Sequence, residues 1–193
     1  MHDATRAYIA GFLDGDGSII FQLVRRLDYV YGYQIRSSVC FYQHSRGKAG
    51  LEWLKGKLGC GCIRDRAGSM SDDTIVGWSD VRRVLELVRP YVVFKHEQVE
   101  RALDILSMLE RRLTPDRFLA AARMVDAFAT LNYSKRKHLD AACVERLLES
   151  KGVLVPVTTE AIMPRSCATA VHQIGPQIYG DDHTPAPGNG MKV

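Results

Sequence analysis

Two acidic residues separated by a glycine stand near the N-terminus, in the segment Asp14-Gly15-Asp16-Gly17. Before them, Ala7, Gly11 and Gly15 recur every four residues, which would place three small residues on one face of a helix. Small residues in this spacing let a second helix approach closely. A carboxylate at the C-terminal end of a helix lies at the negative end of its dipole, where a bound cation would stabilise it. We therefore expect two copies of this helix to pack together and to bring two carboxylates close to each other.

Paired carboxylates with divalent cations are suited to the hydrolysis of phosphodiester bonds. The cations activate a water molecule and stabilise both the attacking and the leaving oxygen, and Mg²⁺ prefers hard oxygen ligands. The same four residues would also serve as a simple turn between a helix and a strand, because Asp and Gly are common turn formers. The residue types alone leave both interpretations open.

The spacing of apolar residues predicts the elements that must position these acids. We expect an α+β chain in which a helix, two strands, a helix, two strands and further helices follow one another. The predicted helices span residues 7–13, 50–58, 79–88, 95–113, 115–131 and 139–150, and the predicted strands span 18–26, 33–43, 62–66 and 74–78. Thr114 and Pro115 are typical of an N-cap and a first helical residue.

The predicted strands alternate between apolar side chains and side chains that hydrogen-bond nucleic acid. The polar set is Gln22, Arg26, Gln34, Arg36, Ser38, Arg64 and Arg66. Arginine suits guanine and glutamine suits adenine in the major groove, so a sheet with this face could lie against DNA. The solvated face of an ordinary antiparallel sheet shows the same alternation, so alternation alone does not decide between them.

The composition is that of a globular protein: 193 residues, 46% hydrophobic, 25% charged, with a net charge of +4 that is compatible with nucleic-acid binding. No apolar run approaches the ~20 residues that cross a membrane, and the N-terminus lacks the pattern of a secretory signal. The five cysteines are irregularly spaced, which disfavours a disulfide framework and favours an intracellular setting. Cys60-Gly61-Cys62 lacks the second Cys/His pair typical of zinc sites.

We expect one domain over residues 1–155 and a C-terminal tail over residues 156–193. The tail contains five of the seven prolines and several glycines, so it is predicted to be extended or poorly ordered.

The eleven residues from Tyr8 to Ser18 resemble the LAGLIDADG motif of homing endonucleases and intron maturases. The chain looks like the green-algal chloroplast ribosomal-intron group of that family over residues 7–150. Further matching segments are 63–66, 89–91, 95–98, 114–119 and 131–135. The resemblance implies an αββαββα fold with a saddle-shaped antiparallel sheet and C-terminal helices. Only one copy of the motif is present, and single-motif members are homodimers.

The resemblance also implies roles for individual residues. Asp16 would be catalytic and would bind Mg²⁺, which Mn²⁺ or Ca²⁺ can replace, with the Gly15 carbonyl as a further ligand. Gln43 would order water in the active site, and Lys95 would lie near the scissile phosphate. Asp14 is expected to be structural, bonding backbone at the helix end. The close helix contact of the dimer would involve Ala7, Gly11 and Gly15.

One position departs from the family pattern. The group has an arginine four residues after the glutamine, whereas this chain has Gly47 there. Arg46 and Lys48 flank that position, and either could replace the missing cation if the loop is shifted.

The DNA-contacting positions implied by the resemblance agree with the polar faces found by alternation. They are Gln22, Val24, Arg26, Asp28, Tyr29, Gln34, Arg36, Ser38, Cys40, Arg64, Arg66 and Thr74. Val24 and Cys40 are the apolar exceptions, and contact with thymine methyl groups is one use for them. Ser134, Lys135 and Lys137 form a basic loop suited to phosphate, and would equally suit a solvated helix flank.

The activity implied is intron homing: metal-dependent cleavage of double-stranded DNA at a long pseudo-palindromic site, leaving short 3′ overhangs. Two alternatives have the same fold, namely an RNA-binding intron maturase and a DNA-binding protein that has lost catalysis. The presence of Asp16, Gln43 and Lys95 favours cleavage. The expected location is an organelle or a bacterial-type cytoplasm, and no membrane partner is expected.

Overall fold

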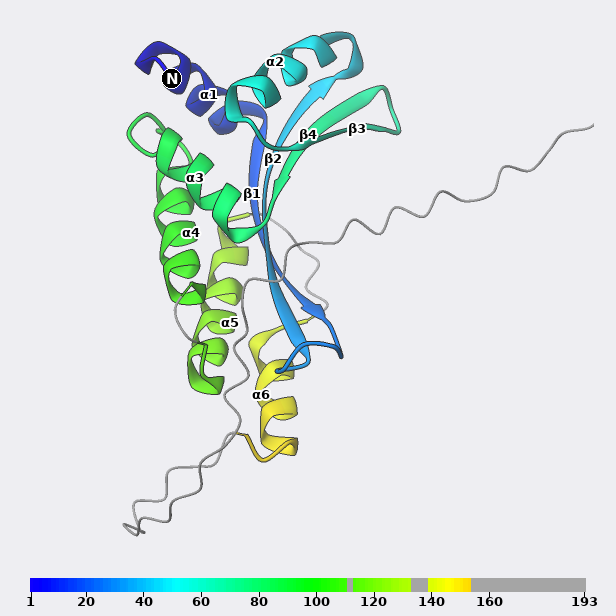
Figure 1. The fold of residues 1–193 in the computed structure, drawn as a ribbon, viewed down its shortest axis with the longest axis vertical. Helices are drawn as coiled ribbons and strands as arrows, with labels where there is room; N and C mark the ends of the chain where they lie inside the picture. The colour runs from blue at the N-terminus through cyan, green and yellow to red at the C-terminus, as the bar shows by residue number, and fades with distance from the viewer. Residues whose placement is uncertain (111–112, 133–138, 154–193) are drawn as a thin grey trace, which may run out of the picture. The chain divides into compact units, whose positions relative to one another are not determined.

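The computed structural model describes residues 1–110, 113–132 and 139–153. The elements are α1 (Asp3–Asp16), β1 (Gly17–Arg25), β2 (Tyr33–His44), the 3₁₀ turn η1 (Ser45–Gly47), α2 (Lys48–Leu58), β3 (Cys62–Arg66), β4 (Met70–Val76), α3 (Trp78–Val88), α4 (His96–Leu109), α5 (Pro115–Thr130) and α6 (Ala141–Ser150). This order confirms the predicted α+β class (Figure 1). The predicted phosphate contacts Ser134, Lys135 and Lys137 and the predicted tail over residues 156–193 lie outside the described residues.

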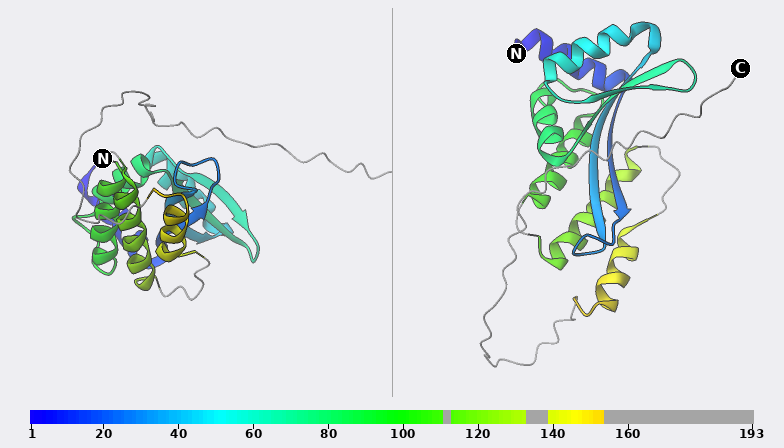
Figure 2. Two further views of the ribbon diagram at one scale, coloured as in Figure 1. Left: turned by 90° about the horizontal axis from the view of Figure 1, so that it is seen from below. Right: turned by 45° about the vertical axis from the view of Figure 1, so that its right-hand side comes forward.

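The four strands form one antiparallel sheet in the order β1-β2-β4-β3. In Figure 2 the helices α4 and α5, in green, lie on one side of the curved strands. Burial alternates along the two long strands, so that Ile19, Phe21 and Leu23 of β1 and Ile35, Val39 and Phe41 of β2 are buried. These are the apolar faces predicted from the alternation, and they lie under the helices.

Aromatic contacts fix two helices on the inner face of the sheet. The rings of Phe21 on β1 and Phe128 on α5 are 5.1 Å apart, and the rings of Phe12 on α1 and Phe41 on β2 are 5.4 Å apart. Such pairs stabilise a core beyond the area that they bury. The second contact holds the C-terminal half of α1 against the sheet and thereby sets the position of Asp16.

The first helix is longer than predicted. The sequence predicts a helix over residues 7–13 that ends in a Gly-Asp-Gly turn, whereas α1 runs from Asp3 to Asp16 and contains both acids. The backbone N–H of Gly17 donates to the Leu13 carbonyl and closes the last turn before β1 begins. A Cβ at Gly17 would lie 2.8 Å from that carbonyl oxygen, so only glycine lets the strand follow the helix so closely.

The fourth strand begins earlier than predicted, at Met70 rather than Thr74. The chain reverses within three residues, with a φ of 77° at Gly68 and 57° at Ser69. Positive φ at successive residues is typical of tight hairpin turns. The polar run from Ser71 to Asp73 lacks apolar alternation, which is why periodicity did not reveal this part of the strand.

The helical region agrees with the prediction more closely. Thr114 caps α5 by accepting a hydrogen bond from the Arg117 N–H at 3.3 Å, as its position before Pro115 predicted. The predicted helix over residues 95–113 is shorter in the structure, where α4 ends at Leu109. Within the described part of the chain, no helix combines the length and the apolar character that crossing a bilayer requires.

Candidate active site and DNA-facing sheet

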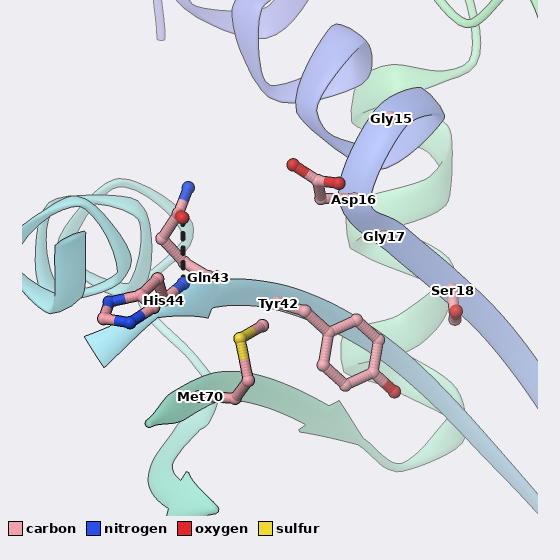
Figure 3. A pocket seen from close by; sticks show the side chains of 8 residues that line it. All are labelled: Gly15, Asp16, Gly17, Ser18, Tyr42, Gln43, His44 and Met70. Carbon is pink, nitrogen blue, oxygen red and sulfur yellow. Dashed lines mark hydrogen bonds between the residues drawn. The ribbon is translucent and has the colours of Figure 1, made fainter. Parts of the chain in front are cut away.

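Asp16 is the last residue of α1, and its side chain is exposed at the edge of a pocket. The pocket has a volume of about 440 Å³ and is lined by Gly15, Asp16, Gly17, Ser18, Tyr42, Gln43, His44 and Met70 (Figure 3). Among the described residues, none forms a hydrogen bond or ion pair with the Asp16 carboxylate. Gly15 lies in the last turn of α1, where helical carbonyls lack an intrahelical partner. The end of α1 therefore presents oxygen atoms that are free to bind a cation.

Asp14 has a different environment from Asp16. Its Oδ2 accepts hydrogen bonds from the N–H groups of Val93 at 2.7 Å and Phe94 at 3.3 Å, and its Oδ1 accepts one from Lys95 N–H at 2.9 Å. The structural role predicted for Asp14 thus takes a specific form. It bonds the backbone of the segment before α4, rather than the end of its own helix.

The same segment places Lys95 beside α1. The Lys95 ammonium donates to the Asp14 carbonyl oxygen at 2.5 Å. Burial lowers the pKa of Lys95 from its ordinary value, while the negative charges of Asp14 and Asp16 act in the opposite direction. The fold therefore brings a lysine and the unpaired Asp16 carboxylate together although they are far apart in the sequence.

Gln43 lies near the end of β2 and borders the same pocket as Asp16. Its Oε1 accepts a hydrogen bond from the His44 N–H at 2.9 Å, which leaves its amide NH₂ without a partner among the described residues. The side chain folds back over Gly47, since a Cβ added at Gly47 would lie 2.9 Å from the Cγ of Gln43. Gln43 thus occupies the space that the side chain of a larger residue at position 47 would need.

The two cations that flank Gly47 differ in their contacts. The Lys48 ammonium binds both carboxylate oxygens of Asp65, at 2.8 and 2.9 Å. Arg46 is exposed, and its guanidinium has no partner in the part of the chain that the structure describes. Neither residue lines the pocket that contains Asp16 and Gln43.

The strand residues predicted to contact DNA share the outer face of the sheet, opposite the core. Gln22 pairs with Arg36, Val24 with Gln34, and Cys40 with Thr74 in the strand register, and Arg64 and Arg66 lie on the same face of β3. Gln22, Arg36, Arg64 and Arg66 are exposed, and Val24, Gln34, Ser38 and Thr74 are partly exposed. The structure therefore assembles four strands into one continuous polar surface.

Three further predicted contacts form one cluster in the turn between β1 and β2. Arg26 donates to both carboxylate oxygens of Asp28, at 3.1 and 2.9 Å, and its guanidinium lies 5.4 Å from the centroid of the Tyr29 ring. Bidentate pairing and stacking both fix the orientation of an arginine. The cluster lies next to the outer face, at the end of β1 and β2 that is farther along the strands from Asp16.

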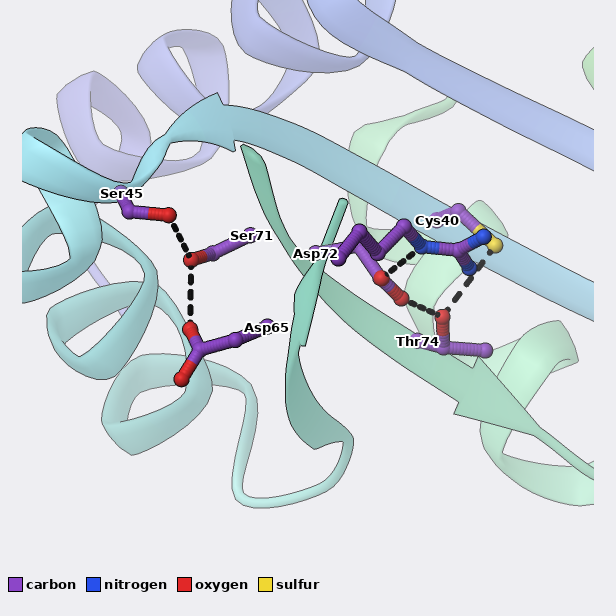
Figure 4. Close-up of polar contacts among 7 residues, drawn as sticks. Cys40, Ser45, Asp65, Ser71, Asp72 and Thr74 are labelled. Carbon is purple, nitrogen blue, oxygen red and sulfur yellow. Dashed lines mark hydrogen bonds and ion pairs between the residues drawn. The ribbon is translucent and has the colours of Figure 1, made fainter. Parts of the chain in front are cut away.

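Asp72 organises a second cluster on the outer face of the sheet. The sequence did not reveal this residue as part of the face, because the strand was predicted to begin at Thr74. Its carboxylate accepts hydrogen bonds from Arg66 and from the Thr74 hydroxyl, which in turn lies 3.4 Å from the Cys40 sulfur (Figure 4). Burial raises the pKa of Asp72, but the bonds from Arg66 and Thr74 and the charges of Arg66 and Arg64 outweigh it and lower the pKa.

This network covers Cys40. Only 3% of Cys40 is exposed, and the Arg66 guanidinium lies 5.8 Å from the centroid of the neighbouring Tyr42 ring. A thymine methyl group would need an exposed side chain to contact, so the structure does not support that use of Cys40. Val24, the other apolar position of the set, is partly exposed.

The small-residue face of α1 is open. Ala7, Gly11 and Gly15 are exposed, and a Cβ added at either glycine would meet nothing within 4 Å. Exposed aromatic residues flank this face: Tyr8 is 64% and Trp53 42% exposed, with their rings 5.6 Å apart, and Phe94 is 86% exposed. No spacing pattern in the sequence marks these aromatics, because only the fold places α2 and the segment before α4 beside α1.

No family model matches the chain. Among curated proteins, it is 33% identical to DNA endonuclease I-CvuI of Chlorella vulgaris over 155 residues, which cover 80% of this chain and 96% of the relative. It is also 33% identical to DNA endonuclease I-CreI of Chlamydomonas reinhardtii over 144 residues, covering 74% of this chain and 88% of the relative.

Solved structures give the same result. The structure of I-CvuI with the I-CreI target DNA and 2 mM Mg has a TM-score of 0.75 and 32% identity to this chain, and covers 79% of this chain and 97% of that one. The archaeal intron-encoded homing endonuclease I-Vdi141I, solved with DNA, has a TM-score of 0.70 at 18% identity over 78% of this chain and 98% of its own, and supports the fold alone. Since two relatives share 33% of their residues with it over most of both chains, this chain belongs to the LAGLIDADG homing endonuclease family.

Proposed function

We propose that the protein is a site-specific endonuclease that cleaves double-stranded DNA as a homodimer, in the process of intron homing. The observation that carries the proposal is the Asp16 carboxylate, which has no partner in the described structure and lies beside Lys95 and Gln43 at one end of a polar sheet face. The relatives I-CvuI and I-CreI are DNA endonucleases, and I-CvuI has been solved in complex with its target.

The end of α1 fits a hard divalent cation, with Mg²⁺ as the proposed metal. Asp16 and the Gly15 carbonyl would hold it, and the I-CvuI complexes were determined with Mg and with Ca. When bound, such a cation activates water and neutralises charge on the phosphate. No group of three or more His, Cys, Asp or Glu side chains that could hold a metal occurs within the described ranges of one chain. The open small-residue face of α1 would let a second copy approach closely, and we propose that Asp16 of that copy completes the site.

The other two proposed catalytic residues act on the DNA and its water. Lys95 carries a positive charge that would stabilise negative charge developing on the scissile phosphate, and its bond to the Asp14 carbonyl orients it. The free amide NH₂ of Gln43 would donate to an oxygen of the attacking water or of the phosphate. Both groups are in place before DNA binds, which reduces the reorganisation that the reaction requires.

A homodimer that presents two copies of the polar sheet face would read a long site with two-fold pseudo-symmetry, because the symmetry of the protein is mirrored in the site. Base readout is assigned to the predicted residues of the outer face other than the buried Cys40, and phosphate contact to Ser134, Lys135 and Lys137. Short 3′ overhangs and a location in an organelle or bacterial-type cytoplasm stay predictions.

The test is cleavage of a duplex that carries the uninterrupted exon junction of the host gene, with the I-CreI target as a second substrate. With Mg²⁺ the protein should nick and cut at least one of them. Asp16→Asn should bind the same duplex and fail to cut it. Intact duplex at saturating wild-type protein would contradict the proposal, and tight binding of the host intron RNA together with inert DNA would favour the maturase alternative.

A further inference from the structure

We propose that His44 donates a hydrogen bond from its Nε2 to a DNA phosphate beside Asp16, in place of the basic side chain that is missing at Gly47. This inference rests on the proposed endonuclease function and adds a substrate contact to it. Three features of the structure carry it: the position of His44, the orientation of its ring, and the contacts of the neighbouring cations.

His44 is the last residue of β2, and its register partner on β4 is Met70. It is exposed, and it lines the same pocket as Asp16 and Gln43. Figure 3 shows its ring beside the Gln43 side chain, with Asp16 across the opening on α1. Tyr42, two residues earlier on the same face of β2, also lines this pocket, so His44 continues the DNA-facing surface to the edge of the active site.

The turn that follows β2 fixes the ring. The Nδ1 atom of His44 accepts a hydrogen bond from the backbone N–H of Arg46 at 3.1 Å, which caps η1. A nitrogen that accepts a hydrogen bond carries no proton, so the neutral ring carries its proton on Nε2. The side chain therefore offers an oriented N–H donor, which suits a phosphate oxygen, and has no free lone pair with which to act as a base.

The neighbouring cations Arg46 and Lys48 are not positioned to make this phosphate contact. Lys48 is bound by Asp65, and neither Arg46 nor Lys48 lines the pocket. The eight residues that line it include no lysine or arginine. The space next to Gly47 is filled by Gln43, whose free amide is assigned to the attacking water or the phosphate, and His44 adds a second fixed donor from this segment at the same pocket.

Two substitutions separate the proposed contact from the capping role. His44→Asn keeps a side-chain oxygen near the Arg46 N–H, as Asn does in capping turns, but lacks a donor at the Nε2 position. His44→Gln loses the cap geometry but can place its amide nitrogen near the position of Nε2. The measurements are single-turnover cleavage rates with Mg²⁺ on the duplex that the wild-type protein cuts, together with melting temperatures.

We expect His44→Asn to lower the cleavage rate about tenfold, the effect of one lost hydrogen bond to a charged group, and His44→Gln to retain most of the rate. Arg46→Ala and Lys48→Ala should cleave at close to the wild-type rate. The inference is overturned if His44→Asn cleaves normally, if His44→Gln is the more impaired of the two, or if Arg46→Ala alone abolishes cleavage. Failure of the wild-type protein to cut any target would instead refute the proposed function.

Discussion

The two acids at the end of α1 have separate tasks. Asp14 accepts hydrogen bonds from three backbone N–H groups before α4, and its carbonyl receives the Lys95 ammonium. Asp16 lies two residues further on, is exposed, and forms no such bonds among the described residues. Asp14 therefore stabilises the backbone around the site, whereas the Asp16 carboxylate remains available to bind a ligand.

We expect Asp14→Ala to lower both stability and cleavage. The substitution leaves the N–H groups of Val93, Phe94 and Lys95 without their acceptor, and a lost bond of this kind costs about 1–3 kcal/mol. Urea unfolding and cleavage assays would measure the two effects. Asp16→Asn is the matched control, with cleavage lost and the unfolding midpoint retained. An Asp14→Ala protein as stable as the wild type would refute the structural role.

At the level of residues, the sequence indicated the candidates that the family resemblance implies, but not the residues whose role depends on tertiary contact. Asp16, Gln43 and Lys95 could be named from the resemblance, and the structure places all three around one end of α1. Asp72 could not be named, because its role depends on Arg66 from a neighbouring strand. The orientation of His44 likewise depends on a backbone N–H that sequence patterns do not reveal.

At the scale of the element, β4 carries two adjacent carboxylates on opposite faces of the sheet. Asp72 faces outward into the network with Arg66 and Thr74. Asp73 faces the core, is 0% exposed, and has neither oxygen hydrogen-bonded in the described structure. Burial raises the pKa of Asp73 to about 6, an effect that the charge of Lys55 opposes and that of Asp72 reinforces. An unpaired buried carboxylate destabilises the fold whenever it is ionised.

The contribution of Asp73 should therefore lower the stability of the protein as the pH rises from about 4 to about 6. Below pH 3.8, the ordinary pKa, Asp73 is protonated in both the folded and the unfolded chain. Above about pH 6 it is ionised in both, and the buried charge then destabilises only the folded chain. The difference between the two pKa values corresponds to about 3 kcal/mol. Urea unfolding at pH 5 and pH 7.5 should show that the stability advantage of Asp73→Asn over the wild type is larger at the higher pH.

Asp72→Asn provides the comparison, because the lowered pKa of Asp72 has the opposite consequence. Its ionised form stabilises the fold above pH 3.8, and this contribution is lost as the pH falls through the folded pKa. The substitution should therefore reduce stability at neutral pH. Equal pH profiles for the two variants would contradict this assignment of the two faces of β4.

Apolar periodicity predicted the order of the elements and most of their bounds, because the buried faces of β1, β2 and the helices are strongly patterned. It failed where polar groups are buried or where a backbone contact sets a boundary. The start of β4 was hidden by Ser71, Asp72 and Asp73, and the end of α1 depends on the close approach of Gly17 to Leu13. Both are features of tertiary packing rather than of local sequence.

At the scale of the whole molecule, the open face of α1 governs assembly. We expect Gly11→Leu to leave the single chain folded, since a Cβ at Gly11 meets nothing within 4 Å and leucine favours helix. The same side chain would block the close approach of a second α1, so dimerisation and cleavage should both be lost. Sedimentation analysis and circular dichroism would report the two properties separately.

Gly56→Leu is the control for that experiment, because Gly56 is also an exposed helical glycine with nothing within 4 Å of an added Cβ. It lies on α2 and, unlike Gly50 and Trp53 of the same helix, does not line the pocket that Gly11 borders, so the variant should dimerise and cleave normally. A Gly11→Leu protein that remains dimeric and active would show that the chain associates through another surface.

The network around Asp72 has a consequence for how target preference can evolve. Because Arg66, Thr74 and Cys40 are held through one carboxylate, a substitution at any of them changes the positions available to the others. Effects of substitutions within such a connected group do not add. In a homodimer each change would also occur twice, once in each half of the interface. New specificities should therefore arise through a few coupled substitutions, with single intermediates that recognise neither the old nor the new site well.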